Sequence, residues 1–250
     1  AFLAYAAVNS DFDRSIERQA DILSLYGSRG AIGFETMGNH LNQIGETGRA
    51  ERMWRESLKL KPHRRLYGNL GQLLATLGRF PEARFYLQKG MELDSTYAPT
   101  YMVMGNTYCL EGNYEAGEPY LRRAAELDTT LAAFPYSLAQ CLVNLGRLAE
   151  GEIYARRAVE LSPKNFAYNN ALALTLAKQG KYAEAEQYFL VALRQHPHDS
   201  NTYVNLAELY SHMERPVQAQ EILQRYLRMN PSGKDRAQVA DYLRKLQENI

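Results

Sequence analysis

The sequence predicts an all-α protein built from stacked helical hairpins, and residues 166–199 show why. Two apolar stripes at helical spacing follow one another in this stretch. Their residues are Leu172, Ala173 and Leu176, then Ala185, Phe189, Ala192 and Leu193. Gly180 lies between the stripes and Pro197 follows the second; glycine permits the turn that ends a helix, and proline cannot continue one. We therefore expect helices over about 167–179 and 183–195.

A hairpin of this kind cannot bury its stripes alone, and the chain supplies copies at a period of about 34 residues. Six windows align in register: 31–63, 64–97, 98–131, 132–165, 166–199 and 200–233. A column on the first helices holds only small residues, as expected where helix backbones approach closely: Gly38, Gly71, Gly105, Ala139, Ala173 and Ala207. The turn column reads Gly45, Gly78, Gly112, Gly146, Gly180 and Glu214. A bulky column on the second helices reads Trp54, Leu87, Leu121, Ala155, Phe189 and Leu223.

This pattern resembles the tetratricopeptide repeat (TPR) family, whose repeats carry Leu-Gly, a turn Gly, Ala, an aromatic residue and a closing Pro. The segments YNNALALTLAKQGKYAEAEQYFLVALRQHP and YVNLAELYSHMERPVQAQEILQRYLRMNP both carry it. Local departures are Pro135 in a first turn and Ala155 in place of a bulky residue. The resemblance implies a right-handed superhelical solenoid of antiparallel helix-turn-helix repeats, with the first helices lining a concave groove.

The two ends of the chain are expected to close the array. Residues 1–30 fit the register as a degenerate N-terminal repeat, with a second helix over 13–26. The opening AFLAYAAV could instead be the tail of a transmembrane helix, but it is too short to span a bilayer, which takes about 20 apolar residues. The chain begins with Ala, which we interpret as processing or excision from a longer protein. Residues 234–250 are predicted to form an amphipathic capping helix.

Composition argues against several classes of protein. The net charge of +1 gives no general attraction to nucleic acid. Two cysteines, Cys109 and Cys141, exclude a disulfide scaffold and are expected to be small core or groove residues. No membrane span is expected in this chain.

No catalytic, metal or cofactor motif is found, so we predict a non-enzymatic protein without cofactor or metal. His196 and His198 could be drawn as a metal site, but a solvated turn is the favoured interpretation. The strongest charge feature is a basic cluster, which is a solvated loop or, alternatively, a contact for an acidic partner. Its residues are Lys59, Lys61, His63, Arg64 and Arg65.

The concave groove is the predicted binding site for a protein or peptide. One groove column holds four consecutive carboxamides, whose donors and acceptors suit the backbone of an extended peptide: Asn39, Gln72, Asn106 and Gln140. Met102 and Tyr136 would form an apolar anchoring pocket, and Asn69 and Asn144 lie in neighbouring columns. The lysine and arginine clamp of chaperone-binding TPR proteins is not expected, because Glu35 and Met102 stand where basic residues would help.

The predicted function is an interaction scaffold that holds a partner segment in this groove. One alternative is the soluble TPR module of a larger assembly protein, such as a bacterial membrane glycosyltransferase or a polysaccharide-export component. Another is a structural scaffold that self-associates through its ends, using residues 1–30. The cytoplasm is the favoured compartment, and the periplasm is the alternative if the chain is excised from a membrane or exported protein.

Overall fold

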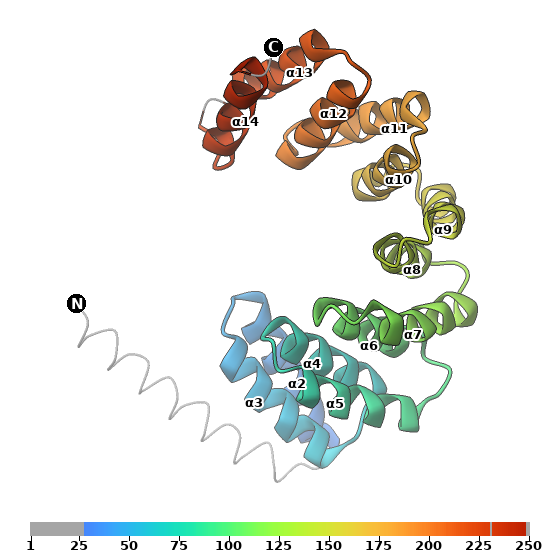
Figure 1. The fold of residues 1–250 in the computed structure, drawn as a ribbon. Helices are drawn as coiled ribbons and strands as arrows, with labels where there is room; N and C mark the ends of the chain where they lie inside the picture. The colour runs from blue at the N-terminus through green and yellow to red at the C-terminus, as the bar shows by residue number, and fades with distance from the viewer. Residues whose placement is uncertain (1–27, 231, 249–250) are drawn as a thin grey trace, which may run out of the picture. The chain divides into compact units, whose positions relative to one another are not determined.

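A computed structural model of the chain describes residues 28–230 and 232–248 (Figure 1). Within these residues it contains 13 α-helices and no strand. The helices of residues 28–127 are α2 (Ser28–Gln43), α3 (Thr47–Leu60), α4 (Arg64–Thr76), α5 (Phe80–Leu93), α6 (Ala98–Leu110) and α7 (Tyr114–Leu127). Those of residues 128–248 are α8 (Ala133–Asn144), α9 (Leu148–Leu161), α10 (Phe166–Lys178), α11 (Tyr182–Gln195), α12 (Ser200–His212), α13 (Pro216–Met229) and α14 (Arg236–Glu248).

The predicted all-α helical repeat fold is confirmed. The helices expected over 167–179 and 183–195 are α10 and α11, each within a residue or so of its predicted ends. The helix expected over 13–26 lies outside the described residues. The division of the chain into six repeats with two end segments stays a prediction.

The described chain forms two compact units, residues 28–127 and residues 128–248. In the first unit α2 packs against α3, α4 against α5 and α6 against α7. In the second unit α8 packs against α9, α10 against α11 and α12 against α13, while α14 packs on α13. Neighbouring hairpins within a unit also touch, as α4 and α6 do in the first and α9 and α10 in the second. Where two hairpins adjoin within a unit, a helix such as α6 or α10 therefore buries one face in its own hairpin and another against the neighbouring hairpin.

Close approach of the two helices within a hairpin explains the column of small residues. A Cβ atom placed on Gly71 would lie 2.5 Å from Leu87, and one on Gly105 would lie 2.5 Å from Leu121. Both leucines are fully buried. Small residues on the first helix therefore make room for the bulky column of the second.

The hairpin turns need left-handed backbone at one position. Five of the six turn-column residues are glycines with φ between 73° and 84°. The sixth is Glu214, whose φ of 57° makes it the one non-glycine residue with positive φ within the described residues. A side chain at that backbone conformation costs about 1 kcal/mol.

The core of the second unit continues from hairpin to hairpin and ends under α14. It includes Leu172, Phe189, Tyr203 and Tyr226, which are fully or almost fully buried. Val239 of α14 is 1% exposed in this core, and Tyr242, Leu243 and Leu246 pack against it. The apolar side of α14 therefore covers the last hairpin, and its other side faces solvent.

Charged networks also join successive hairpins. In the first unit Glu51 of α3 accepts hydrogen bonds from Arg55 and Arg79, and both arginines also reach Glu82 of α5. The second unit repeats this arrangement at matching positions, with Glu152 and Arg156 on α9, Lys181 before α11 and Glu184 on α11. Each network ties the second helix of one hairpin to the second helix of the next.

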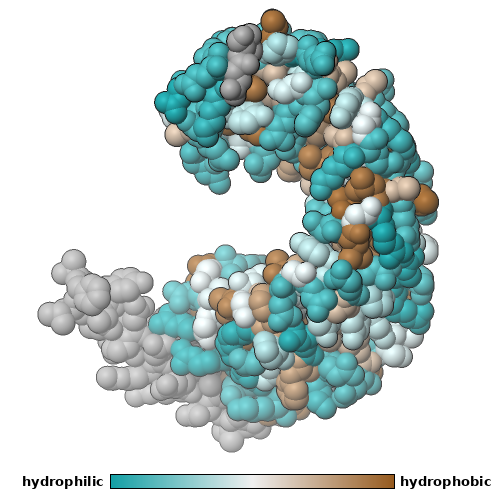
Figure 2. Space-filling view, viewed as in Figure 1, coloured by the Kyte–Doolittle hydropathy of each residue, from teal (hydrophilic) through white to brown (hydrophobic). Residues whose placement is uncertain are grey.

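The surface is mostly hydrophilic on the face drawn in Figure 2, with apolar residues in small, scattered groups. The exposed large apolar side chains include Ile32, Phe85 and Ile153. They are spread over α2, α5 and α9. Among the described residues, no helix is both long enough and apolar enough to cross a membrane.

Candidate functional site

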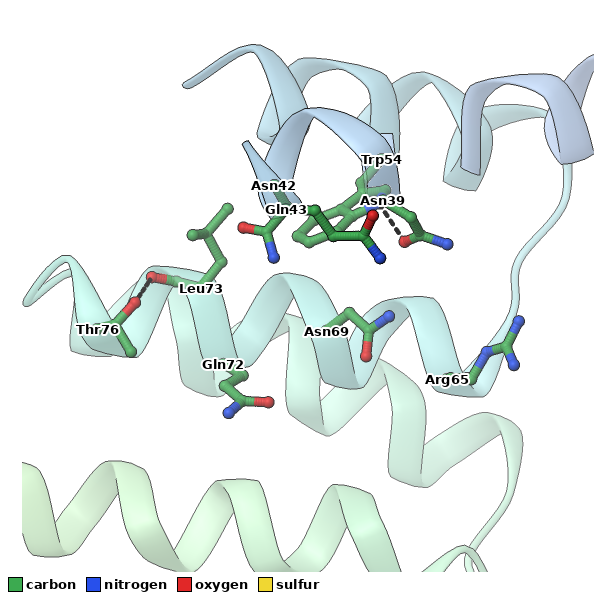
Figure 3. A pocket seen from close by; sticks show the side chains of 9 residues that line it. All are labelled: Asn39, Asn42, Gln43, Trp54, Arg65, Asn69, Gln72, Leu73 and Thr76. Carbon is green, nitrogen blue, oxygen red and sulfur yellow. Dashed lines mark hydrogen bonds between the residues drawn. The ribbon is translucent and has the colours of Figure 1, made fainter. Parts of the chain in front are cut away.

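A pocket of about 520 Å³ lies between the first helices of two neighbouring hairpins, α2 and α4, in the first unit (Figure 3). Its lining residues are Asn39, Asn42, Gln43, Trp54, Arg65, Asn69, Gln72, Leu73 and Thr76. Five of these nine side chains are carboxamides. None of the described residues that line the pocket is acidic. The pocket is therefore rich in hydrogen-bonding groups and carries no negative charge of its own.

Trp54 lies on α3, and its side chain forms part of the pocket wall. A Cβ atom on Gly38 would lie 2.4 Å from Cδ1 of Trp54, so the absence of a side chain at this position allows the indole to lie against the helix backbone. The indole is 3% exposed, and its Nε1 donates a hydrogen bond of 3.1 Å to Oδ1 of Asn39. The packing of α3 on α2 therefore fixes the side chain of Asn39.

Arg65 supplies the one cationic side chain among the described residues of the pocket. Its Nη2 donates to Oε1 of Glu35 across a distance of 2.9 Å. Glu35 belongs to α2 and is not among the lining residues. The positive charge of Arg65 is therefore balanced by a carboxylate beside the pocket.

The predicted site residues Asn39, Asn69 and Gln72 are brought together in this pocket. Asn69 is half-buried and Gln72 is exposed. Neither has a hydrogen-bond partner among the residues that the structure describes. Their amide groups are therefore available to a ligand, in either orientation of the amide.

The remaining predicted site residues lie elsewhere. Met102 and Asn106 are half-buried on α6 of the first unit and do not line the pocket. Tyr136, Gln140 and Asn144 belong to α8 of the second unit. A single amide ladder along all these positions stays a prediction.

The three predicted residues of α8 interact within the second unit. Gln140 Nε2 donates to the Tyr136 hydroxyl at 2.9 Å, and Asn144 Nδ2 donates to the backbone carbonyl oxygen of Gln140 at 2.8 Å. The Tyr136 ring packs on Tyr168 with 4.8 Å between centroids. Burial, together with the neighbouring Tyr168, raises the pKa of Tyr136. In the absence of a ligand, the side-chain amides of Gln140 and Asn144 therefore already donate hydrogen bonds within α8.

Six of the nine pocket residues were not among the predicted site residues: Asn42, Gln43, Trp54, Arg65, Leu73 and Thr76. Asn42 lies one helical turn after Asn39, so helical spacing alone could have found it. Trp54 differs from every other residue of its column because it carries an N–H donor. The N–H donor of Trp54 was the feature of the sequence that indicated a polar contact with α2.

The basic cluster is largely neutralised by neighbouring carboxylates. Lys59 pairs with Glu56 at 2.6 Å, Arg64 pairs with Asp94, and Arg65 pairs with Glu35. Hydrogen bonds from Thr96, with a further one from Arg64, lower the pKa of Asp94 to about 2. These pairs favour the solvated-loop interpretation of the cluster over an open site for an acidic partner.

The two turn histidines have structural contacts. The His196 ring stacks on Phe166 with 4.5 Å between centroids, and His198 Nδ1 lies 2.7 Å from Oδ1 of Asn230. Within the described ranges, no three histidine, cysteine or acidic side chains are grouped so as to hold a metal ion. His196 therefore packs within the α10–α11 hairpin, and His198 contacts the end of the next hairpin, after α13.

Comparison with solved structures shows the same fold in several proteins of low sequence identity. YrrB, described as a TPR protein with an unusual peptide-binding site, has a TM-score of 0.60 and 23% identity over 77% of this chain and 97% of its own. PilF of Pseudomonas aeruginosa has a TM-score of 0.69 and 18% identity over 85% of this chain and 97% of its own. A chain of the APC/C hetero-tetramer Cut9–Hcn1 has a TM-score of 0.72 and 18% identity over 86% of this chain and 42% of its own.

Comparison with curated protein sequences gave no match. Two family models, both described as tetratricopeptide repeat, match the chain. One matches residues 36–97, 105–166 and 136–200, and the other matches residues 176–246. Together these ranges include well over half of the sequence, so the chain belongs to the tetratricopeptide repeat family.

Proposed function

We propose that this chain is a non-enzymatic scaffold that binds an extended segment of a partner protein along the first helices of its hairpins. Tetratricopeptide repeats and the similar TPR structures indicate a protein–protein interaction scaffold. The finer part of the proposal is the site, which we place at the pocket between α2 and α4.

The observation that carries the proposal is the density of carboxamides in this pocket. Each amide offers two donors and an acceptor, which matches the alternating N–H and C=O groups of a peptide backbone. Asn69 and Gln72 have no partner among the described residues and would be satisfied by such a backbone. A pocket of about 520 Å³ is of the size that takes a few residues of a ligand. The peptide-binding site named for YrrB supports the idea by analogy of fold.

Panning a displayed library of random linear peptides against the full chain would test this proposal. Recovered peptides would be measured by titration calorimetry against the parent and the double variant Asn69→Ala/Gln72→Ala. We expect the double variant to bind about ten-fold more weakly or worse, because each lost hydrogen bond is worth about 1 kcal/mol.

A matched control is Gln187→Ala/Gln218→Ala, which truncates two exposed amides on α11 and α13, outside the pocket. The control should bind like the parent. Equal affinity of the parent and the pocket variant would contradict the proposed site. Self-association through residues 1–30 stays a separate prediction, since residues 1–27 lie outside the described part of the chain.

A further inference from the structure

The hydrogen bond between Trp54 and Asn39 determines which group of Asn39 faces the pocket. An indole nitrogen is a donor only, so the atom of Asn39 that contacts Trp54 Nε1 at 3.1 Å must be the amide oxygen. This assignment follows from the chemistry of the indole and does not depend on distinguishing oxygen from nitrogen in the amide. The two N–H donors of the Asn39 amide then remain for a ligand.

Packing around the indole keeps Trp54 in position to donate its hydrogen bond to the Asn39 amide. Trp54 is 3% exposed and lies against the backbone of α2 at Gly38. The matching positions of the other hairpins hold Leu87, Leu121, Ala155, Phe189 and Leu223, none of which has a donor in its side chain. Within the column of bulky residues, only the first described hairpin therefore offers an indole donor that can fix an amide in this way.

The rest of the pocket has two chemically different ends. Figure 3 shows Asn39 and Arg65 toward one end and Thr76 at the other. Arg65 has only donors, and its charge is balanced by Glu35 at 2.9 Å. The Thr76 hydroxyl donates its hydrogen to the Leu73 carbonyl oxygen at 2.7 Å, so lone pairs remain on that side. The Asn39–Arg65 end thus presents donors without net charge.

We propose that the Asn39–Arg65 end of the pocket is a donor-rich subsite for an uncharged carbonyl oxygen, such as that of a peptide group, and that Trp54 is the positioning residue that fixes the Asn39 amide with its donors toward this subsite. This inference rests on the proposed function, since it names the chemistry of the group that the same pocket receives. A carboxylate is disfavoured at this end because Glu35 already neutralises Arg65 and repels a second anion. An ammonium group is disfavoured at this end because it would meet the N–H donors of Asn39 and Arg65.

Small probes can test the polarity without a known partner. The full ¹⁵N-labelled chain is titrated separately with N,N-dimethylacetamide, which only accepts, with acetate, and with n-butylammonium, which only donates. The side-chain amide resonances of Asn39 and the indole resonance of Trp54 are followed. We expect dimethylacetamide to move the Asn39 amide protons at lower concentration than acetate, and n-butylammonium to leave them unchanged.

Two variants separate polarity from packing. Asn39→Asp keeps an oxygen for Trp54 but replaces the donors with a carboxylate oxygen, so binding of dimethylacetamide should weaken about five-fold or more. Gln187→Glu is the control, because it adds the same charge at an exposed position of α11 outside the pocket and leaves the Trp54 contact intact; it should bind dimethylacetamide like the parent. Trp54→Phe frees the amide of Asn39, so selection against n-butylammonium should be lost if circular dichroism shows a folded protein.

Several outcomes would overturn the inference. These are equal response to n-butylammonium, stronger response to acetate than to dimethylacetamide, no response of Asn39 to any probe, or unchanged binding by Asn39→Asp. The proposed function fails by a different result, namely peptides that ignore Asn69 and Gln72 or a library that yields none. Either test can therefore fail while the other succeeds.

Discussion

Gly38 shows how the absence of one side chain shapes the candidate site. Substitution Gly38→Ala would place a methyl group 2.4 Å from the buried indole ring of Trp54. We expect a loss of about 2 kcal/mol in the free energy of unfolding, because overpacked cores force backbone shifts. Denaturant titration followed by circular dichroism measures it.

Gly48 is the matched control for this substitution. It is also helical, in the first turn of α3, but a Cβ atom there meets nothing within 4 Å. Gly48→Ala should leave stability unchanged or raise it by about 0.5 kcal/mol, because alanine loses less entropy in a helix. If both variants lose stability equally, contact with Trp54 is not the cause.

Glu214 occupies a turn position that the other hairpins give to glycine. Its φ of 57° is costly for a residue with a Cβ atom, so Glu214→Gly should raise the unfolding free energy of the second unit by about 1 kcal/mol. Gly180→Ala imposes the reverse change at φ 75° and should lower it by a similar amount. Thermal unfolding of the two variants would show opposite shifts, and shifts of the same sign would refute this account.

At the residue scale, the sequence predicted the positions of the groove amides but not their orientation or their hydrogen-bond partners. The column that contains Asn39 and Gln72 followed from periodicity, and both residues line the pocket. The fixed amide of Asn39 and the pairing of Arg65 with Glu35 depend on side-chain rotamers and on contacts between hairpins. Periodicity carries no information on either, so these features needed the structure.

At the scale of the helix pair, the charged network at Glu152 makes a specific contribution to stability. Burial alone would raise the pKa of Glu152, but hydrogen bonds from Lys181, Arg156 and Gln179 outweigh it and lower the pKa to about 2. The Glu152 side chain is 11% exposed, and its carboxylate joins α9 to the hairpin of α10 and α11. Its loss should therefore weaken the contact between these two hairpins.

We expect Glu152→Gln to lower the unfolding free energy at pH 7 by about 2 kcal/mol. The depressed pKa means that the stabilisation is complete above the ordinary value of 4.5 and is lost as the pH falls from there toward 2. Parent and variant should thus converge in acid. Glu160→Gln is the control, because Glu160 pairs with Arg157 at 3.2 Å on an exposed surface. Exposed pairs of this kind contribute about 0.5 kcal/mol or less, so this variant should hardly change the unfolding free energy.

Helices were the level at which the sequence was most informative. The stripe, the turn glycine and the closing proline predicted α10 and α11 closely, because each signal acts through local backbone geometry. Helix α8 begins at Ala133 and contains Pro135 in its first turn, which is tolerated because the first N–H groups of a helix have no partner within it. A local departure from the repeat pattern therefore left the helix intact.

At the scale of the whole molecule, each hairpin depends on its neighbours, so damage should spread over a short distance only. Val239 of α14 is 1% exposed, and Val239→Ala removes two buried methyl groups there. We expect the free energy of unfolding to fall by about 2 kcal/mol. Hydrogen exchange followed by mass spectrometry should show faster exchange in α12, α13 and α14, with α4 and α5 unchanged. A uniform rise along the chain would mean that the array unfolds as a single cooperative unit.

The burial of Trp54 has an optical consequence for the whole chain. It is the only tryptophan among 250 residues, and it lies in the wall of the candidate pocket. Selective excitation of indole fluorescence therefore reports on the α2–α3 hairpin alone, while the eighteen tyrosines report on the rest. Melting of this hairpin, or quenching by an occupant of the pocket, can be followed in the unlabelled protein against the tyrosine signal as an internal reference.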